Sequence, residues 1–331
     1  MASLCFVSHL ISKYQEIGDI VGKPNPQTHQ ACRSLLQKAV RRGNTSLVRK
    51  VAGHLQSIGD ADWLKARTSI ITFEECWPLG VDLQLKPDFE GILDILTRIA
   101  QTVKVKDAAG LGVLAYELSR GDTSVLSGTP EDQHIQRMVE VIKNSQDFWT
   151  WATQNCSQTN QQSLIQLSKR AYGRGGWPWD RALIQAAAYL AVTNSIPETH
   201  LAKQPSVEVP FWVGLDKHTS QGKKALQDAA KNMGVSVRQL TWVSFYFESA
   251  LANESTESYW WSRERQWRLT RIGIDQDKAL LMWEKALPIF IELLREEIAT
   301  LQKHLEEPLG NETSKIAKEA SPTQQVCLPG F

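Results

Sequence analysis

The chain has 331 residues, 42% of them hydrophobic, and a formal net charge of +1. This length and apolar content are sufficient for a large buried core. The near-neutral charge excludes a protein that binds polyanions through its overall charge, so any contact with nucleic acid must come from a local patch.

The N-terminal half is predicted to be a series of helices. Apolar residues recur at helical spacing over 30–42, and Gly43 separates this helix from a second one over 45–56. Amphipathic helices are also predicted over 89–103 and 135–151, where apolar residues again recur every three or four positions.

The C-terminal half contains the expected connections. The polar stretch 152–162 is predicted to join two units. Glycines and prolines indicate a shaped loop over 172–179, and Asp180 is expected to cap a helix over 181–193. A last long helix is predicted over 275–305.

Strand signals are few, so the predicted class is mainly α, a multi-helix globular scaffold with few or no strands. We predict a helical domain over 1–155 and a second helical domain, or a continuation of the first, over 156–305. The polar segment 306–331 is expected to be a flexible tail.

Several features argue for a cytoplasmic protein without cofactors. No apolar run is long enough to span a bilayer, and the first ten residues lack the features of a secretory signal, so we expect no membrane segment. The five cysteines are scattered and form no Cys-x-x-Cys pair, which favours reduced thiols. No spacing of His, Cys and Asp indicates a metal site, and we expect neither a metal nor another cofactor.

Part of the N-terminal half resembles a known family. The matching residues are Leu36-Gln37-Lys38, Arg41-Arg42-Gly43-Asn44, Ile70-Ile71 and Glu74-Glu75. The segment 30–85 that contains them looks like the C-terminal helical region of the replication-associated recombination proteins, the clamp-loader-like AAA+ ATPases of the Mgs/Werner-interacting class. The resemblance implies a helical scaffold and a role in DNA metabolism.

The resemblance does not extend to ATP hydrolysis. No Gly-x-x-x-x-Gly-Lys-[Ser/Thr] sequence occurs, so we expect no ATPase activity. The family's acidic end, Glu-Asp followed by Ile-Gly, is here replaced by Glu74-Glu75-Cys76-Trp77. Two roles stay open for Arg41 and Glu75: walls of a DNA-binding cleft, or residues that pack and pair within the scaffold.

A dense polar cluster precedes a predicted helix over 222–233. Asp216 could act as a base or stabilise a cation, and His218 can titrate near neutral pH. Lys217, Thr219 and Lys223 could hold phosphates at the start of the helix. The alternative is that Thr219 or Ser220 caps the helix and that Asp216 and His218 are polar groups of an ordinary loop.

Two aromatic segments suit nucleic acid. The loop over 172–179 presents Arg174, Trp177 and Trp179, which could stack on an unpaired or flipped base, or could instead seal the core. The segment 258–271 interleaves tryptophans with arginines and is predicted to be a further nucleic-acid face.

The first functional hypothesis is an ATP-independent DNA N-glycosylase that removes a flipped base in repair or in defence against phage. Such an enzyme needs a carboxylate, aromatic side chains that hold the base, and cations for the phosphates. The catalytic candidates are Asp216, His218 and Glu75. The DNA-binding candidates are Arg41, Arg42, Arg174, Trp177, Trp179, Lys217, Thr219 and Lys223.

The second hypothesis is a non-catalytic module derived from an ATPase scaffold. It would bind DNA or a replication partner, with assembly into a homo-oligomer as a further option. A third hypothesis is a factor that binds only other proteins. Binding to DNA without release of a base would favour the second hypothesis over the first.

Overall fold

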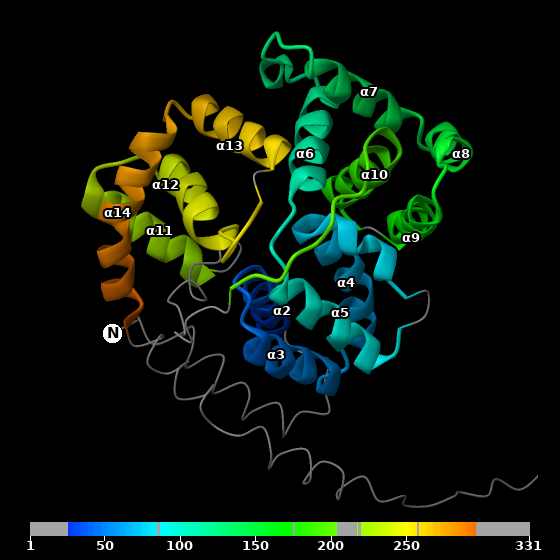
Figure 1. The fold of residues 1–331 in the computed structure, drawn as a ribbon. Coiled ribbons are helices and arrows are strands. Elements are labelled where there is room, and N and C mark those ends of the chain that lie inside the picture. The colour runs from blue at the N-terminus through cyan, green and yellow to red at the C-terminus, as the bar shows by residue number, and fades with distance from the viewer. Residues whose placement is uncertain are drawn as a thin grey trace, which may run out of the picture.

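The computed structural model describes residues 26–84, 87–174, 176–203, 217, 220–256 and 258–295. These residues form helices and no named strand, which confirms the mainly α class (Figure 1). The predicted tail over 306–331 lies outside them. No helix in the described ranges is long and apolar enough to cross a membrane.

The α-helices are α2 (Pro26–Arg41), α3 (Thr45–Ser57), α4 (Ala61–Glu75), α5 (Phe89–Gln101), α6 (Asp107–Ser119), α7 (Asp132–Lys143), α8 (Ser145–Asn155), α9 (Thr159–Arg174), α10 (Pro178–Thr193), α11 (Ser220–Met233), α12 (Val237–Ser244), α13 (Tyr259–Arg271) and α14 (Gln276–Leu293). Short 3-10 helices are η1 (Trp77–Asp82) and η2 (Thr123–Val125). A single π-helical turn, η4 (Phe245–Ser249), follows α12.

The first hydrophobic core is built by α2 to α10, and α13 adds Trp260 and Trp267 to it. Helix α6 lies at its centre, in contact with α4, α7, α10 and α13 (Figure 1). Seven residues of α6 between Ala108 and Ala115 are buried, so the helix has no polar face. A helix that is apolar on all sides is typical of a core position.

Two glycines allow this close packing around α6. A Cβ atom at Gly110 would lie 2.2 Å from the backbone carbonyl carbon of Trp260 in α13. A Cβ atom at Gly112 would lie 2.6 Å from the Cα atom of Leu183 in α10. Both contacts are too short for any side chain, so the backbones of α13 and α10 approach α6 only because these positions carry hydrogen.

A second core is formed by α11, α12 and α14, with Leu269 and Ile274 from the end of α13 and the turn after it. The division between the cores therefore lies between α10 and α11, and the residues on both sides of position 155 belong to the first core. The reason is that α9 and α10 bury apolar residues in that core, including Leu164 and Ile184.

Several predicted element boundaries are corrected. The helix expected over 135–151 is two helices, broken at Asn144, whose φ of −120° and ψ of 56° are not helical. The connector expected over 152–162 is mostly helical, because α8 runs to Asn155 and α9 begins at Thr159. Asp180 does not occupy the cap position of α10, which belongs to Trp177.

Candidate functional site

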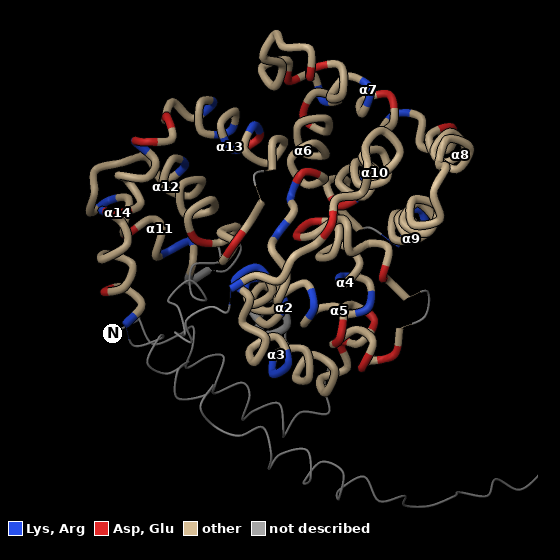
Figure 2. Tube along the Cα trace, viewed as in Figure 1, with Lys and Arg blue, Asp and Glu red and all other residues tan. Residues whose placement is uncertain are grey.

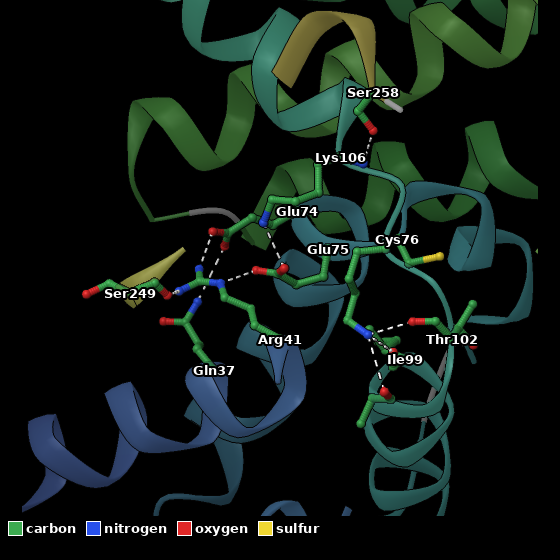
Figure 3. A network of polar contacts seen from close by, with 12 residues as sticks. Gln37, Arg41, Glu74, Glu75, Cys76, Ile99, Thr102, Lys106, Ser249 and Ser258 are labelled. Carbon is green, nitrogen blue, oxygen red and sulfur yellow. Dashed lines mark hydrogen bonds and ion pairs between the residues drawn. The ribbon is translucent and has the colours of Figure 1, made fainter. Parts of the chain in front are cut away.

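The arginine pair of the family-like segment lies at the C-terminal end of α2, where it turns inward. Figure 3 shows the Arg41 guanidinium between Glu74 and Glu75 at the end of α4. Its Nε donates a short hydrogen bond to Glu75, and its Nη2 donates to Oε1 of Glu74 at 2.5 Å. Its Nη1 donates to the backbone carbonyl of Ser249 at 2.9 Å, which links the first core to the π-helical turn.

Glu75 is 1% exposed, and both of its carboxylate oxygens accept hydrogen bonds (Figure 3). Oε1 accepts from Arg41 and Oε2 accepts from Nζ of Lys106 at 2.8 Å. The Lys106 ammonium also lies 4.6 Å from the centre of the Trp261 ring. A carboxylate held in this way is closed to a substrate, so the geometry favours the pairing role of Glu75 over the catalytic one.

The ion pairs shift the pKa values of their members. Burial opposes the charge of Glu74, but Arg41 and Arg67 outweigh it and lower the pKa of this carboxyl to about 2. Burial likewise opposes the charge of Arg41, and the two glutamates raise its pKa above the ordinary value. Both groups are therefore charged throughout the physiological pH range.

The neighbouring cations of α2 also face the interior. Nη2 of Arg42 donates to the backbone carbonyl of Glu248 at 2.7 Å, and Nζ of Lys38 lies 3.3 Å from the Glu248 carboxylate. Burial raises the pKa of Glu248. Arg41 and Arg42, which were candidates for gripping DNA, are thus engaged in joining α2 to the π-helical turn.

Lys104 is another buried cation, 1% exposed, and follows the C-terminal end of α5. Its Nζ donates to the backbone carbonyls of Thr102 at 2.6 Å, Ile99 at 2.7 Å and Ala100 at 3.3 Å. These carbonyls form the negative end of the helix dipole and hold the ammonium. Burial nevertheless lowers the pKa of Lys104 to about 8.

We expect this shift to make stability depend on pH. The folded protein releases the Lys104 proton near pH 8, whereas the unfolded chain holds it until about 10.5. The unfolded state therefore binds more protons between these values, so the free energy of unfolding rises with pH there, by at most about 1.4 kcal/mol per pH unit. A Lys104→Met variant lacks this rise. Urea unfolding of both proteins from pH 7 to 9.5 measures the difference, and parallel profiles would contradict the expectation.

The other candidates gather where α9 ends and α10 begins. Arg174 closes α9 and is exposed. Trp177 is 73% exposed, and within the described ranges its ring has no aromatic or cationic partner. Trp179 is 38% exposed and packs edge-on against Tyr116, with 6.1 Å between ring centres. The two tryptophans thus differ in their surroundings: Trp179 packs against Tyr116 and lies near Arg268, whereas Trp177 faces solvent.

This corner is basic because acids are absent from a long stretch of sequence. Residues 148–179 contain no Asp or Glu. Figure 2 shows basic and no acidic positions along α9, where Lys169 and Arg174 are exposed. Arg181 in the first turn of α10 is also exposed, with its guanidinium carbon 5.6 Å from the ring of Tyr172. We call Lys169, Arg174, Trp177 and Arg181 the α9–α10 corner.

A small hollow, partly open to solvent, lies beside the corner. Lys65 of α4, Arg98 of α5 and Arg174 of α9 bring three cations to its wall. Arg98 pairs with Asp82 at 3.1 Å, whereas Lys65 and Arg174 have no ion-pair partner in the described part of the chain. Asp94 adds a second acidic group to the lining.

Helix α13 covers most of the predicted nucleic-acid face over 258–271, and several of its arginines form ion pairs. Arg263 pairs with Asp132, Arg268 pairs with Glu264 at 3.2 Å, and Arg271 pairs with Asp122 at 2.5 Å. These three arginines are paired within the protein and two tryptophans of α13 lie in the first core, so the geometry favours a packing role for this helix.

The remaining candidates are dispersed or undescribed. Lys217 lies with its Nζ 4.5 Å from the ring centres of Trp242 and Phe245 in the second core. Lys223 is exposed on α11. Asp216, His218 and Thr219 lie outside the described residues.

Sequence reasoning missed Lys65, Arg98, Lys169 and Arg181. The absence of acids over 148–179 could have indicated Lys169, whereas Lys65 and Arg98 join the site only through the packing of α4 and α5. No sequence signal indicated Arg181, which follows Asp180. Among the described residues, no group of three His, Cys, Asp or Glu side chains could hold a metal ion. No family model, curated protein or solved structure matches the chain.

Proposed function

We propose that the protein is a non-catalytic DNA-binding module that contacts DNA through the α9–α10 corner. The observation that carries this proposal is an exposed tryptophan, Trp177, beside exposed cations in a stretch of sequence, 148–179, that contains no Asp or Glu. Exposed aromatic rings and exposed cations are the two elements that sequence-independent nucleic-acid binding requires. The resemblance of residues 30–85 to a DNA-maintenance scaffold supports the same class of partner.

The geometry favours binding over base removal. Both oxygens of Glu75 are engaged in buried ion pairs, so this residue does not support an N-glycosylase. The enzyme hypothesis then depends on Asp216 and His218, and a base-release assay with an Asp216→Asn variant tests it. Binding without release of any base would leave the module as the function.

We expect the intact protein to bind a labelled oligonucleotide at low salt, with an affinity that falls as salt rises. Each phosphate contact contributes a slope of about −0.7 to −0.9 in log K against log salt. Arg174→Ala should weaken binding and make this slope shallower by about one contact. Fluorescence anisotropy over a salt series measures both quantities.

The matched control is Lys285→Ala, which removes an exposed cation from α14 in the second core. Its affinity and salt slope should equal those of the unchanged protein. Absence of binding at low salt, or equal effects of the two variants, would refute a DNA interface at the α9–α10 corner.

A further inference from the structure

We propose that the α9–α10 corner is specific for unpaired DNA, with a base stacked on Trp177 and a neighbouring phosphate between Arg174 and Lys65. This inference rests on the proposed function and names the form of DNA that the corner takes. The inference follows from three features. The Trp177 ring has a free face, the backbone that carries this ring is held in place, and the neighbouring hollow has few cations without an ion-pair partner.

The first feature is the free face of the Trp177 ring. Bases inside a duplex cover one another, so only unpaired bases have a face to offer to an aromatic side chain. The Trp177 indole is 73% exposed, and an unstacked base can cover one side of it. The edge of a duplex offers no such flat face.

The second feature is the mounting of that ring. Trp177 precedes Pro178, which restricts it to extended backbone, and its φ of −99° and ψ of 145° agree with this. The first turn of α10 is fixed to α4, because Nη1 of Arg67 donates to both carboxylate oxygens of Asp180 at 3.0 Å. The backbone that carries the ring is therefore positioned before binding, which reduces the conformational entropy lost when a base stacks on the ring.

The third feature is the charge of the hollow. Arg174 and Lys65 are its cations without an ion-pair partner in the described part of the chain, whereas Asp82 compensates Arg98 and Asp94 adds negative charge. Two cations without an ion-pair partner match about one phosphate and are few for the many phosphate contacts of a duplex-binding surface.

The stacking platform and the phosphate site are close enough to serve the same short piece of strand. Three peptide units separate Arg174 from Trp177, which limits the distance between their Cα atoms to about 11 Å. Arg174 itself lines the hollow together with Lys65 and Ser69. One strand can therefore place a base on the ring and its backbone in the hollow.

The test compares a labelled oligothymidine with a blunt-ended duplex that carries a similar number of phosphates, using the intact protein. We expect the strand to bind more tightly. Trp177→Ala should weaken binding of the strand about 5- to 150-fold, the range that loss of one stacked base gives. The same change should leave the residual duplex affinity unaltered, and Trp177→Phe should restore most of the strand affinity.

Two further variants distinguish the possible outcomes of this test. Tyr259→Ala removes another exposed aromatic ring, 49% exposed at the start of α13, and should leave strand binding unchanged. Lys65→Gln should weaken strand binding without removing the ring. If the protein binds DNA but Trp177→Ala behaves like Tyr259→Ala, or if the duplex binds as tightly as the strand, the preference for unpaired DNA is wrong while the DNA-binding function stands. If neither DNA binds at low salt, the proposed function itself fails.

Discussion

A Glu75→Gln variant is expected to lose about 3–5 kcal/mol of unfolding free energy, the usual cost of removing one partner from a buried ion pair. Glutamine keeps the shape of the side chain but not its charge. Lys106 would then remain buried without its carboxylate partner, and Arg41 would retain only Glu74 and a backbone carbonyl. Urea unfolding followed by circular dichroism measures the loss.

The comparison variant is Glu140→Ala on the exposed side of α7, where the contact with Lys143 is 4.0 Å long and open to water. It should cost less than about 1 kcal/mol. A double variant, Glu75→Gln with Lys106→Met, should lose less than the sum of the two single variants, because the unmatched ammonium is removed together with its partner. An unfolding free energy unchanged by Glu75→Gln would show that this carboxylate is not part of a buried network.

Gly110→Ala is expected to destabilise the protein by about 3 kcal/mol, the upper end of the usual cost of inserting a methyl group into a packed core. The added Cβ atom would meet the backbone of α13 at 2.2 Å, and the backbone has no rotamer by which to move away. Either α13 must separate from α6 or α6 must shift within the first core. Thermal and urea unfolding of the variant measure the effect.

The matched substitution is Gly53→Ala in α3, where no atom lies within 4 Å of the new methyl group. There alanine should stabilise the helix by about 0.5–1 kcal/mol, because glycine loses more backbone entropy on folding. Opposite signs for the two substitutions are therefore expected. Equal stability of the Gly110 and Gly53 variants would mean that α13 does not rest on α6 as described.

The amphipathic helices were predictable from the sequence, whereas the central helix α6 was not. Helices α3 and α5 have one apolar face each, and their positions agree with the predictions over 45–56 and 89–103. Helix α6 is apolar on every side, so it leaves no helical periodicity to detect. The break at Asn144 also escaped prediction, because the apolar spacing continues across it from α7 into α8.

The candidate site was also only partly predictable from the sequence. The sequence indicated that Arg41 and Glu75 could either pair or bind, and only tertiary packing decides, since the two residues come from different helices and are buried together. From the sequence, Trp177 and Trp179 had the same two possible roles, stacking on a base or sealing the core. They differ because α6 supplies Tyr116 to cover Trp179 and nothing covers Trp177 in the described ranges.

Helix α13 contributes side chains to both cores. Trp260 and Trp267 complete the first core, while Leu269, further along the same helix, belongs to the second. We therefore expect neither half of the molecule to be stable as a separate fragment. A fragment ending after α10 would lack the two tryptophans that complete the first core, and a fragment beginning at α11 would expose them to water. Because one helix contributes to both cores, we expect them to unfold together in a single transition.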